Sequence, residues 1–137
     1  IRGNIMKIIA IDVGNSETTI GVGNSQGWQG YRFTTRKTVT SDELLMMFKT
    51  IIDDPLIKEG LIEGAIICSV VPEITNSVSN ATSRFISKDV LIVGPGIKTG
   101  LKVNIDNPKE LGPDRIANSI GGYSKVSSEV IVVDLGT

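Results

Sequence analysis

The clearest structural signal in the chain is Ile8-Ile9-Ala10-Ile11-Asp12-Val13-Gly14-Asn15-Ser16, close to its start. An apolar, largely β-branched run that leads into an aspartate predicts a buried strand ending in a polar turn. Gly14 lets the backbone turn tightly and approach a phosphate group closely. Backbone amides and the Ser16 hydroxyl can then face phosphate oxygens, while the Asp12 carboxylate can hold a cation or orient a nucleophile. The segment therefore predicts a phosphate-binding loop after the first strand.

A second copy of this pattern lies at the end of the sequence, at Val130-Ile131-Val132-Val133-Asp134-Leu135-Gly136-Thr137. Asp12 and Asp134 are separated by about the length of one α/β unit. A single strand that ends in Asp-x-Gly is an ordinary hairpin turn, but two copies set one domain apart favour two loops that hold a nucleotide from both sides. We therefore expect a duplicated architecture whose second unit starts near Val130 and breaks off inside its first motif.

The sequence between the two copies has the pattern of one α/β unit. Apolar runs bounded by turn residues predict strands at 7–13, 18–22, 28–34, 64–71, 90–93 and 130–133. Apolar residues at helical spacing predict helices from a cap at Ser41 to residue 52, from 72 to 86 and from 114 to 126, with an irregular connection over 100–111. This order predicts a ribonuclease-H-like α/β fold of the actin-like ATPase group, built on a mixed five-stranded sheet.

Two domain boundaries follow from the repeat. We expect Met6 to be the natural start and residues 1–5 to be a remnant that precedes it. Residues 6–111 would form the first domain with its connection, and residues 112–137 the helix and first strand of a truncated second domain. Pro55 and Gly60 mark the exit from the first helix.

Composition narrows the class of protein. The chain has 137 residues, of which 40% are hydrophobic and 21% charged, the balance of one soluble globular domain. A net charge of −1 without a long basic run favours neither nucleic acid nor an anionic membrane as a partner. Because histidine is absent, metal or acid–base chemistry would fall to carboxylates, hydroxyls, lysines or backbone groups. A single cysteine, Cys68, and no apolar run of membrane-spanning length lead us to expect a cytoplasmic protein.

Two other glycine-containing segments resemble known nucleotide-binding motifs, a P-loop and a dinucleotide-binding fingerprint, but lack residues that these motifs require. A P-loop requires glycine directly before Lys98-Thr99, where this chain has Ile97. Gly21-x-Gly23 lacks the third glycine of a dinucleotide fingerprint and opens no predicted helix. Cys68 lies in an apolar run and is interpreted as a buried small apolar residue.

The segment Leu111-Gly112-Pro113-Asp114-Arg115-Ile116-Ala117-Asn118 allows two interpretations. Proline suits the first turn of a helix, so Asp114 could be a capping residue and Arg115 a solvated side chain. Alternatively, Asp114 aligns and deprotonates a substrate hydroxyl for in-line attack on a γ-phosphate, and Arg115 holds the substrate or neutralises transferring charge. Spacing alone does not separate the two.

Taken in order, these motifs resemble the type III pantothenate kinase family from Met6 to Thr137. The matching segments are 11–16, Cys68-Ser69-Val70-Val71-Pro72, 94–100, Asp106-Asn107-Pro108, 112–118 and 134–137. The resemblance implies ATP-dependent phosphorylation of pantothenate, the first step of coenzyme A synthesis. It also implies Mg²⁺, a monovalent cation such as K⁺ or NH₄⁺, and a homodimer with no nucleic-acid or membrane partner.

The resemblance also implies roles for individual residues. Asp114 would be the catalytic base. Asp12 would hold Mg²⁺ through water, and Asp134 would lie near the monovalent cation. The residues implied in the two phosphate loops are Asp12, Gly14, Asn15, Ser16, Asp134, Gly136 and Thr137. The residues implied against pantothenate are Gly112, Arg115 and Ile105.

The sequence departs from the family pattern at three places. Pro113 stands where alanine is expected, which a helix start tolerates. Ile105 replaces a tyrosine that faces pantothenate in some members, and the chain stops at Thr137, where members continue into a second domain. Three alternatives stay open: a transcriptional accessory factor of the same family, a sugar kinase, acetate kinase or ATPase of the same fold group, and a nucleotide-binding half-domain without activity.

Overall fold

The computed structural model describes residues 6–53, 61–94 and 97–135. The strands are β1 (Met6–Val13), β2 (Glu17–Asn24), β3 (Gly27–Thr34), β4 (Leu61–Ser69) and β5 (Val90–Ile92). The helices are α1 (Ser41–Ile52), α2 (Pro72–Ile86) and α3 (Pro113–Val126), with a 3₁₀ turn at Pro108–Glu110. Pro55 and Gly60, predicted to end the first helix, lie outside the described residues, as do residues 1–5.

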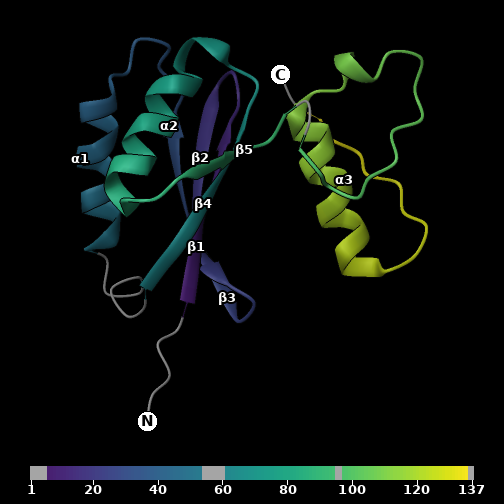
Figure 1. Cartoon of the computed structure of the whole chain (residues 1–137), viewed down its shortest axis with the longest axis horizontal. Coiled ribbons are helices and arrows are strands. Elements are labelled where there is room, and N and C mark those ends of the chain that lie inside the picture. The colour runs from purple at the N-terminus through teal and green to yellow at the C-terminus, as the bar shows by residue number, and fades with distance from the viewer. Residues whose placement is uncertain (1–5, 54–60, 95–96, 136–137) are drawn as a thin grey trace.

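The five strands form one mixed sheet in the order β3-β2-β1-β4-β5 (Figure 1). The first three strands pair antiparallel through two short turns. β4 and β5 then add in parallel on the other side of β1, each after a helical crossover. This is the ribonuclease-H-like α/β arrangement predicted from the element order, with β1 at the centre of the sheet.

The core lies between one face of the sheet and the pair α1 and α2, which cover that face together (Figure 1). Side chains alternate along each strand, so β1 sends Ile9, Ile11 and Val13 into this core and turns Ala10 and Asp12 to the opposite face. α3 lies on that opposite side, next to β4 (Figure 1). The second face of the sheet is therefore left to form a site.

The N-cap of helix α1 is Thr40, one residue before the predicted cap at Ser41, which is instead the first residue of the helix. The Thr40 hydroxyl accepts a hydrogen bond from the Glu43 amide at 3.3 Å, and Glu43 Oε2 accepts one from the Thr40 amide at 2.8 Å. This reciprocal pair is a capping box, which needs an acceptor three residues after the cap. Glu43 stands at that spacing from Thr40 and not from Ser41.

The predicted strand over 130–133 is irregular in the structure. Ile131 is 91% exposed and Val133 74% exposed, and no strand of the described chain lies beside them. Backbone groups in a strand need a neighbour to pair with, so an apolar run alone does not make one. The helices predicted at 72–86 and 114–126 are confirmed to within one residue. No described helix is long and apolar enough to cross a membrane.

Candidate active site

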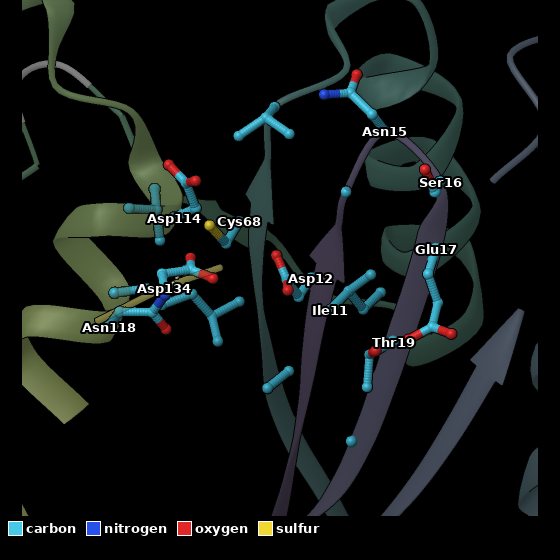
Figure 2. A pocket seen from close by; sticks show the side chains of 17 residues that line it. Ile11, Asp12, Asn15, Ser16, Glu17, Thr19, Cys68, Asp114, Asn118 and Asp134 are labelled. Carbon is cyan, nitrogen blue, oxygen red and sulfur yellow. Dashed lines mark hydrogen bonds between the residues drawn. The ribbon is translucent and has the colours of Figure 1, made fainter. Parts of the chain in front are cut away.

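A pocket of about 530 Å³ lies between the free face of the sheet and α3 (Figure 2). Its floor comes from β1, β2 and β4, where Asp12 is in register with Thr19 on one side and Cys68 on the other. Its opposite wall comes from the first two turns of α3. The turn after β1 forms the rim, through Gly14, Asn15 and Ser16 in the positions that the sequence predicted.

Three carboxylates from distant parts of the chain share this pocket: Asp12, Asp114 and Asp134. Asp12 ends β1, Asp114 lies in the first turn of α3, and Asp134 lies in the segment that follows α3. Figure 2 shows all three on the same side of β1, close to Cys68 and Asn118. The fold thus brings together Asp12 and Asp134, the two aspartates of the sequence repeat. It also adds Asp114, which the sequence left open as either a capping residue or a catalytic base.

Asp134 is placed by a contact with α3. Asn118 Nδ2 donates a hydrogen bond of 3.0 Å to Asp134 Oδ2. A Cβ on Gly122 would come within 2.8 Å of Val132 Cγ2, so the glycine lets the returning segment lie close against the helix. This segment runs back beside α3 although it forms no strand (Figure 1).

The surroundings of Asp12 disfavour its ionised form. Although the side chain is open to the pocket, desolvation by the surrounding protein raises the pKa of the Asp12 carboxyl, and the charges of Asp114 and Asp134 raise it further. A hydrogen bond with the Cys68 thiol acts in the opposite direction and lowers it. Burial, followed by the charges of Asp12 and Asp114, raises the pKa of Cys68 to about 12. The thiol therefore stays protonated at neutral pH and can donate to Asp12.

Two glycines make room for the functional groups. A Cβ on Gly14 would lie 2.9 Å from the Glu17 carbonyl oxygen, which already accepts a hydrogen bond of 2.9 Å from the Gly14 amide. A Cβ on Gly112, the N-cap of α3, would collide with the Asp114 carboxylate. A side chain at either position would meet a neighbouring oxygen atom, of Glu17 or of Asp114, unless that atom moved. This close approach explains why both predicted site residues are glycines.

The structure brings most predicted site residues together and leaves others apart. The predicted residues that line the pocket are Asp12, Gly14, Asn15, Ser16, Asp114 and Asp134. Gly112 adjoins it through Asp114, whereas Arg115 is exposed and Ile105 is 47% exposed, and neither lines the pocket. Gly136 and Thr137 lie outside the described residues.

Sequence reasoning missed four polar residues of the pocket lining: Glu17, Thr19, Cys68 and Asn118. Asn118 stands four residues after Asp114, so helical spacing could have placed it on the same face. Cys68 was interpreted as a buried small apolar residue, and its side chain is buried at 8% exposure. Its contact with Asp12 depends on the parallel register of β1 and β4, which no local pattern in the sequence reveals.

The pocket fits a cation together with a phosphate group better than either alone. Among the described residues that line it, Asp12, Glu17, Asp114 and Asp134 are acidic and none is a lysine or arginine. In the described part of the chain, no group of three or more His, Cys, Asp or Glu side chains converges closely enough to hold a metal ion by itself. Carboxylate oxygens suit Mg²⁺, which usually keeps water ligands and is shared with substrate phosphates. A polyphosphate would need such a cation here.

The sequence is similar to those of known proteins. Residues 8–137 match the protein family described as type III pantothenate kinase. The type III pantothenate kinase of Exiguobacterium sibiricum is 39% identical over 131 residues, which are 95% of this chain and 52% of that protein. That of Listeria welshimeri is 43% identical over 131 residues, 95% of this chain and 51% of that protein. The chain spans about half the length of the curated relatives it matches.

One solved structure is a distant likeness. The PPX-GPPA enzyme of Aquifex aeolicus is 13% identical with a TM-score of 0.37, and the match covers 66% of this chain and 36% of that one.

Proposed function

Since this chain belongs to the type III pantothenate kinase family, we propose that it forms about half of an enzyme that transfers the γ-phosphoryl group of ATP to pantothenate. The product would be 4'-phosphopantothenate, and the step would be the first of coenzyme A synthesis. The observation that carries the proposal is the convergence of Asp12, Asp114 and the turn at 14–16 on one pocket. Phosphoryl transfer needs these parts: a phosphate loop, a carboxylate for the cation and a carboxylate for the nucleophile.

Asp114 is the residue proposed to act on pantothenate. Its carboxylate would accept the hydrogen bond of the reacting hydroxyl, orient that oxygen toward the γ-phosphorus and take its proton as the bond forms. Asp114 lies in the first turn of α3, where the helix dipole stabilises negative charge. A loose transition state asks for little basicity, so a well-placed carboxylate is sufficient.

The turn after β1 and two carboxylates are proposed to receive the nucleotide. Asn15 and Ser16 would donate hydrogen bonds to ATP phosphates, and Asp12 would hold Mg²⁺ through water. A monovalent cation, K⁺ or NH₄⁺, would lie near Asp134. These cations would neutralise the phosphate charge in a pocket whose described lining supplies no basic side chain.

The remaining assignments rest on the family match. We propose that Gly112, Arg115 and Ile105 lie next to pantothenate. Gly136 and Thr137 are proposed to belong to the second phosphate loop. Gly112 has support from its contact with Asp114, since it sets where that carboxylate lies. A cytoplasmic homodimer that binds neither nucleic acid nor membrane is proposed for the longer protein.

The proposal is tested by a coupled ADP-release assay on the longer gene product that carries this sequence, with pantothenate, Mg²⁺ and K⁺. Asp114→Asn keeps the size of the side chain and removes its charge, so kcat should fall by about 10²- to 10⁴-fold. The matched control is Asp106→Asn, because Asp106 is exposed and outside the pocket lining. Equal activity in the two variants would remove Asp114 from the mechanism, and a folded wild type with no pantothenate-dependent ADP release would refute the proposed function.

A further inference from the structure

Thr35 contacts the turn at 14–16 through both its side chain and its backbone. It directly follows β3 and lies 21 residues from Gly14 in the sequence. Its hydroxyl donates a hydrogen bond of 2.7 Å to the Gly14 carbonyl oxygen. Its backbone amide donates one of 2.9 Å to the Ser16 carbonyl oxygen. One residue that directly follows a different strand thus binds both ends of the turn that lines the rim of the pocket.

A second hydroxyl fixes the orientation of the first. Thr18 Oγ1 and Thr35 Oγ1 are 2.9 Å apart, and Thr18 is only 7% exposed. A hydroxyl has one proton to donate. Since the Thr35 proton is given to Gly14, Thr18 must be the donor to Thr35. The result is a directed chain from the buried Thr18 through Thr35 to the Gly14 carbonyl, and such chains strengthen each bond along them.

This chain sets the direction of the peptide group between Gly14 and Asn15. In a trans peptide the C=O and N–H groups point in opposite directions. Since the carbonyl points to Thr35, the Asn15 amide points away from Thr35. Gly14 and Asn15 both line the pocket. The Gly14 amide is already bonded to Glu17, whereas the Asn15 amide makes no hydrogen bond within the described residues. The Asn15 amide is therefore a backbone donor of this turn that a ligand can use.

We propose that Thr35 is a positioning residue, which holds the turn at 14–16 so that the Asn15 amide meets a nucleotide phosphate. The inference rests on the proposed function for the identity of the ligand, and on the four hydrogen bonds around Thr35 and Gly14 for the geometry. Thr35 would touch neither substrate. Its loss should therefore weaken nucleotide binding and leave pantothenate binding unchanged.

Four variants of the longer gene product, at Thr35, Thr38 and Thr18, test this role. Thr35→Val keeps the shape of the side chain and the backbone amide but removes the hydroxyl, and Thr35→Ser restores the hydroxyl. Thr38→Val is the matched control, because Thr38 is an exposed threonine nearby. Amide hydrogen exchange at residues 14–18 is read without ligand, Mg·ATP and pantothenate affinities by calorimetry, and KM for each substrate by ADP release.

In Thr35→Val we expect loop exchange about tenfold faster and an ATP affinity about ten- to a hundredfold weaker, because a half-buried hydroxyl that makes two hydrogen bonds is lost. KM for pantothenate should stay within about twofold, and Thr35→Ser should recover most of the loss. Thr18→Val should show the same pattern more weakly, since it removes the donor to Thr35.

Two results would overturn the inference. The first is an unchanged ATP affinity and unchanged loop exchange in Thr35→Val. The second is a loss that Thr35→Ser fails to repair, or that falls equally on pantothenate, which would make Thr35 a packing residue. Exchange and nucleotide affinity are both read without turnover. A failure of pantothenate phosphorylation in the wild type would therefore leave the test of Thr35 readable.

Discussion

Asp12 is a residue whose ionisation is affected by the pocket. Its carboxylate is desolvated by the surrounding protein and faces the charges of Asp114 and Asp134, while the Cys68 thiol donates a compensating hydrogen bond. A group whose pKa is raised by folding stabilises the fold while it is protonated and loses that contribution when it ionises. The ionised Asp12 carboxylate thus lowers the stability of the fold at neutral pH, and the proposed cation would neutralise this charge.

The first prediction concerns the stability that the fold loses when Asp12 ionises. Asp12→Asn should raise the free energy of unfolding at pH 7, since it removes a charge that the folded state disfavours. The gain should be below about 1 kcal/mol, because the open pocket screens the charges. It should be absent below the ordinary carboxyl pKa of 3.8, where both states are protonated, and appear as pH rises through the raised pKa of Asp12. Urea unfolding from pH 3 to pH 8, with Asp106→Asn as control, measures it; a destabilised variant at pH 7 would contradict the account.

A second prediction at this scale concerns the glycine before the proposed base. In Gly112→Ala the new methyl group would collide with the Asp114 carboxylate and push it from its position. Misplacement of a catalytic group by about 1 Å costs roughly 10²-fold in rate, so kcat should fall by about that factor. Gly121→Ala is the control, since a Cβ there meets nothing within 4 Å. Matching rates in the two variants would show that the contact is unimportant.

The regular elements were the most predictable part of the molecule. α2 and α3 each begin with a proline that fits the first turn, so their starts could be read from Pro72 and Pro113. The cap of α1 was misplaced by one residue because Thr40 and Ser41 are both good caps, and only Glu43 chooses between them. The prediction of a strand at 130–133 was wrong, because strand formation depends on a neighbouring strand to pair with and not on local sequence pattern alone.

The capping box of α1 gives a prediction at the scale of one element. Thr40→Ala should lower the free energy of unfolding by about 1 kcal/mol, within a range of about 0.5–2, because it leaves the first-turn amide of Glu43 unpaired. Ser41→Ala should change it far less, since Ser41 is already inside the helix. Thermal and urea unfolding measure both variants. The reverse order would return the cap to Ser41, and neither variant should alter nucleotide affinity.

At the scale of the whole molecule, the site is assembled from segments that are far apart in the sequence. The repeat predicted that Asp12 and Asp134 would face one ligand, and the structure places both in one pocket. The contribution of Cys68 and the role of Thr35 could not be predicted, because each depends on which strand lies beside β1 or β2. The sequence shows which functional side chains are present near each motif, whereas the contacts that orient those side chains depend on how the strands pair.

The central claim is that this pocket belongs to a kinase that acts on pantothenate. The most direct measurement uses the longer gene product with ATP labelled at the γ-phosphoryl group, offered pantothenate, acetate or a hexose, and follows the label by mass spectrometry. The account predicts label on the primary hydroxyl of pantothenate alone, abolished in Asp114→Asn and retained in Asp106→Asn. Label released only as inorganic phosphate whatever the acceptor, or transferred to acetate or hexose instead, would contradict it.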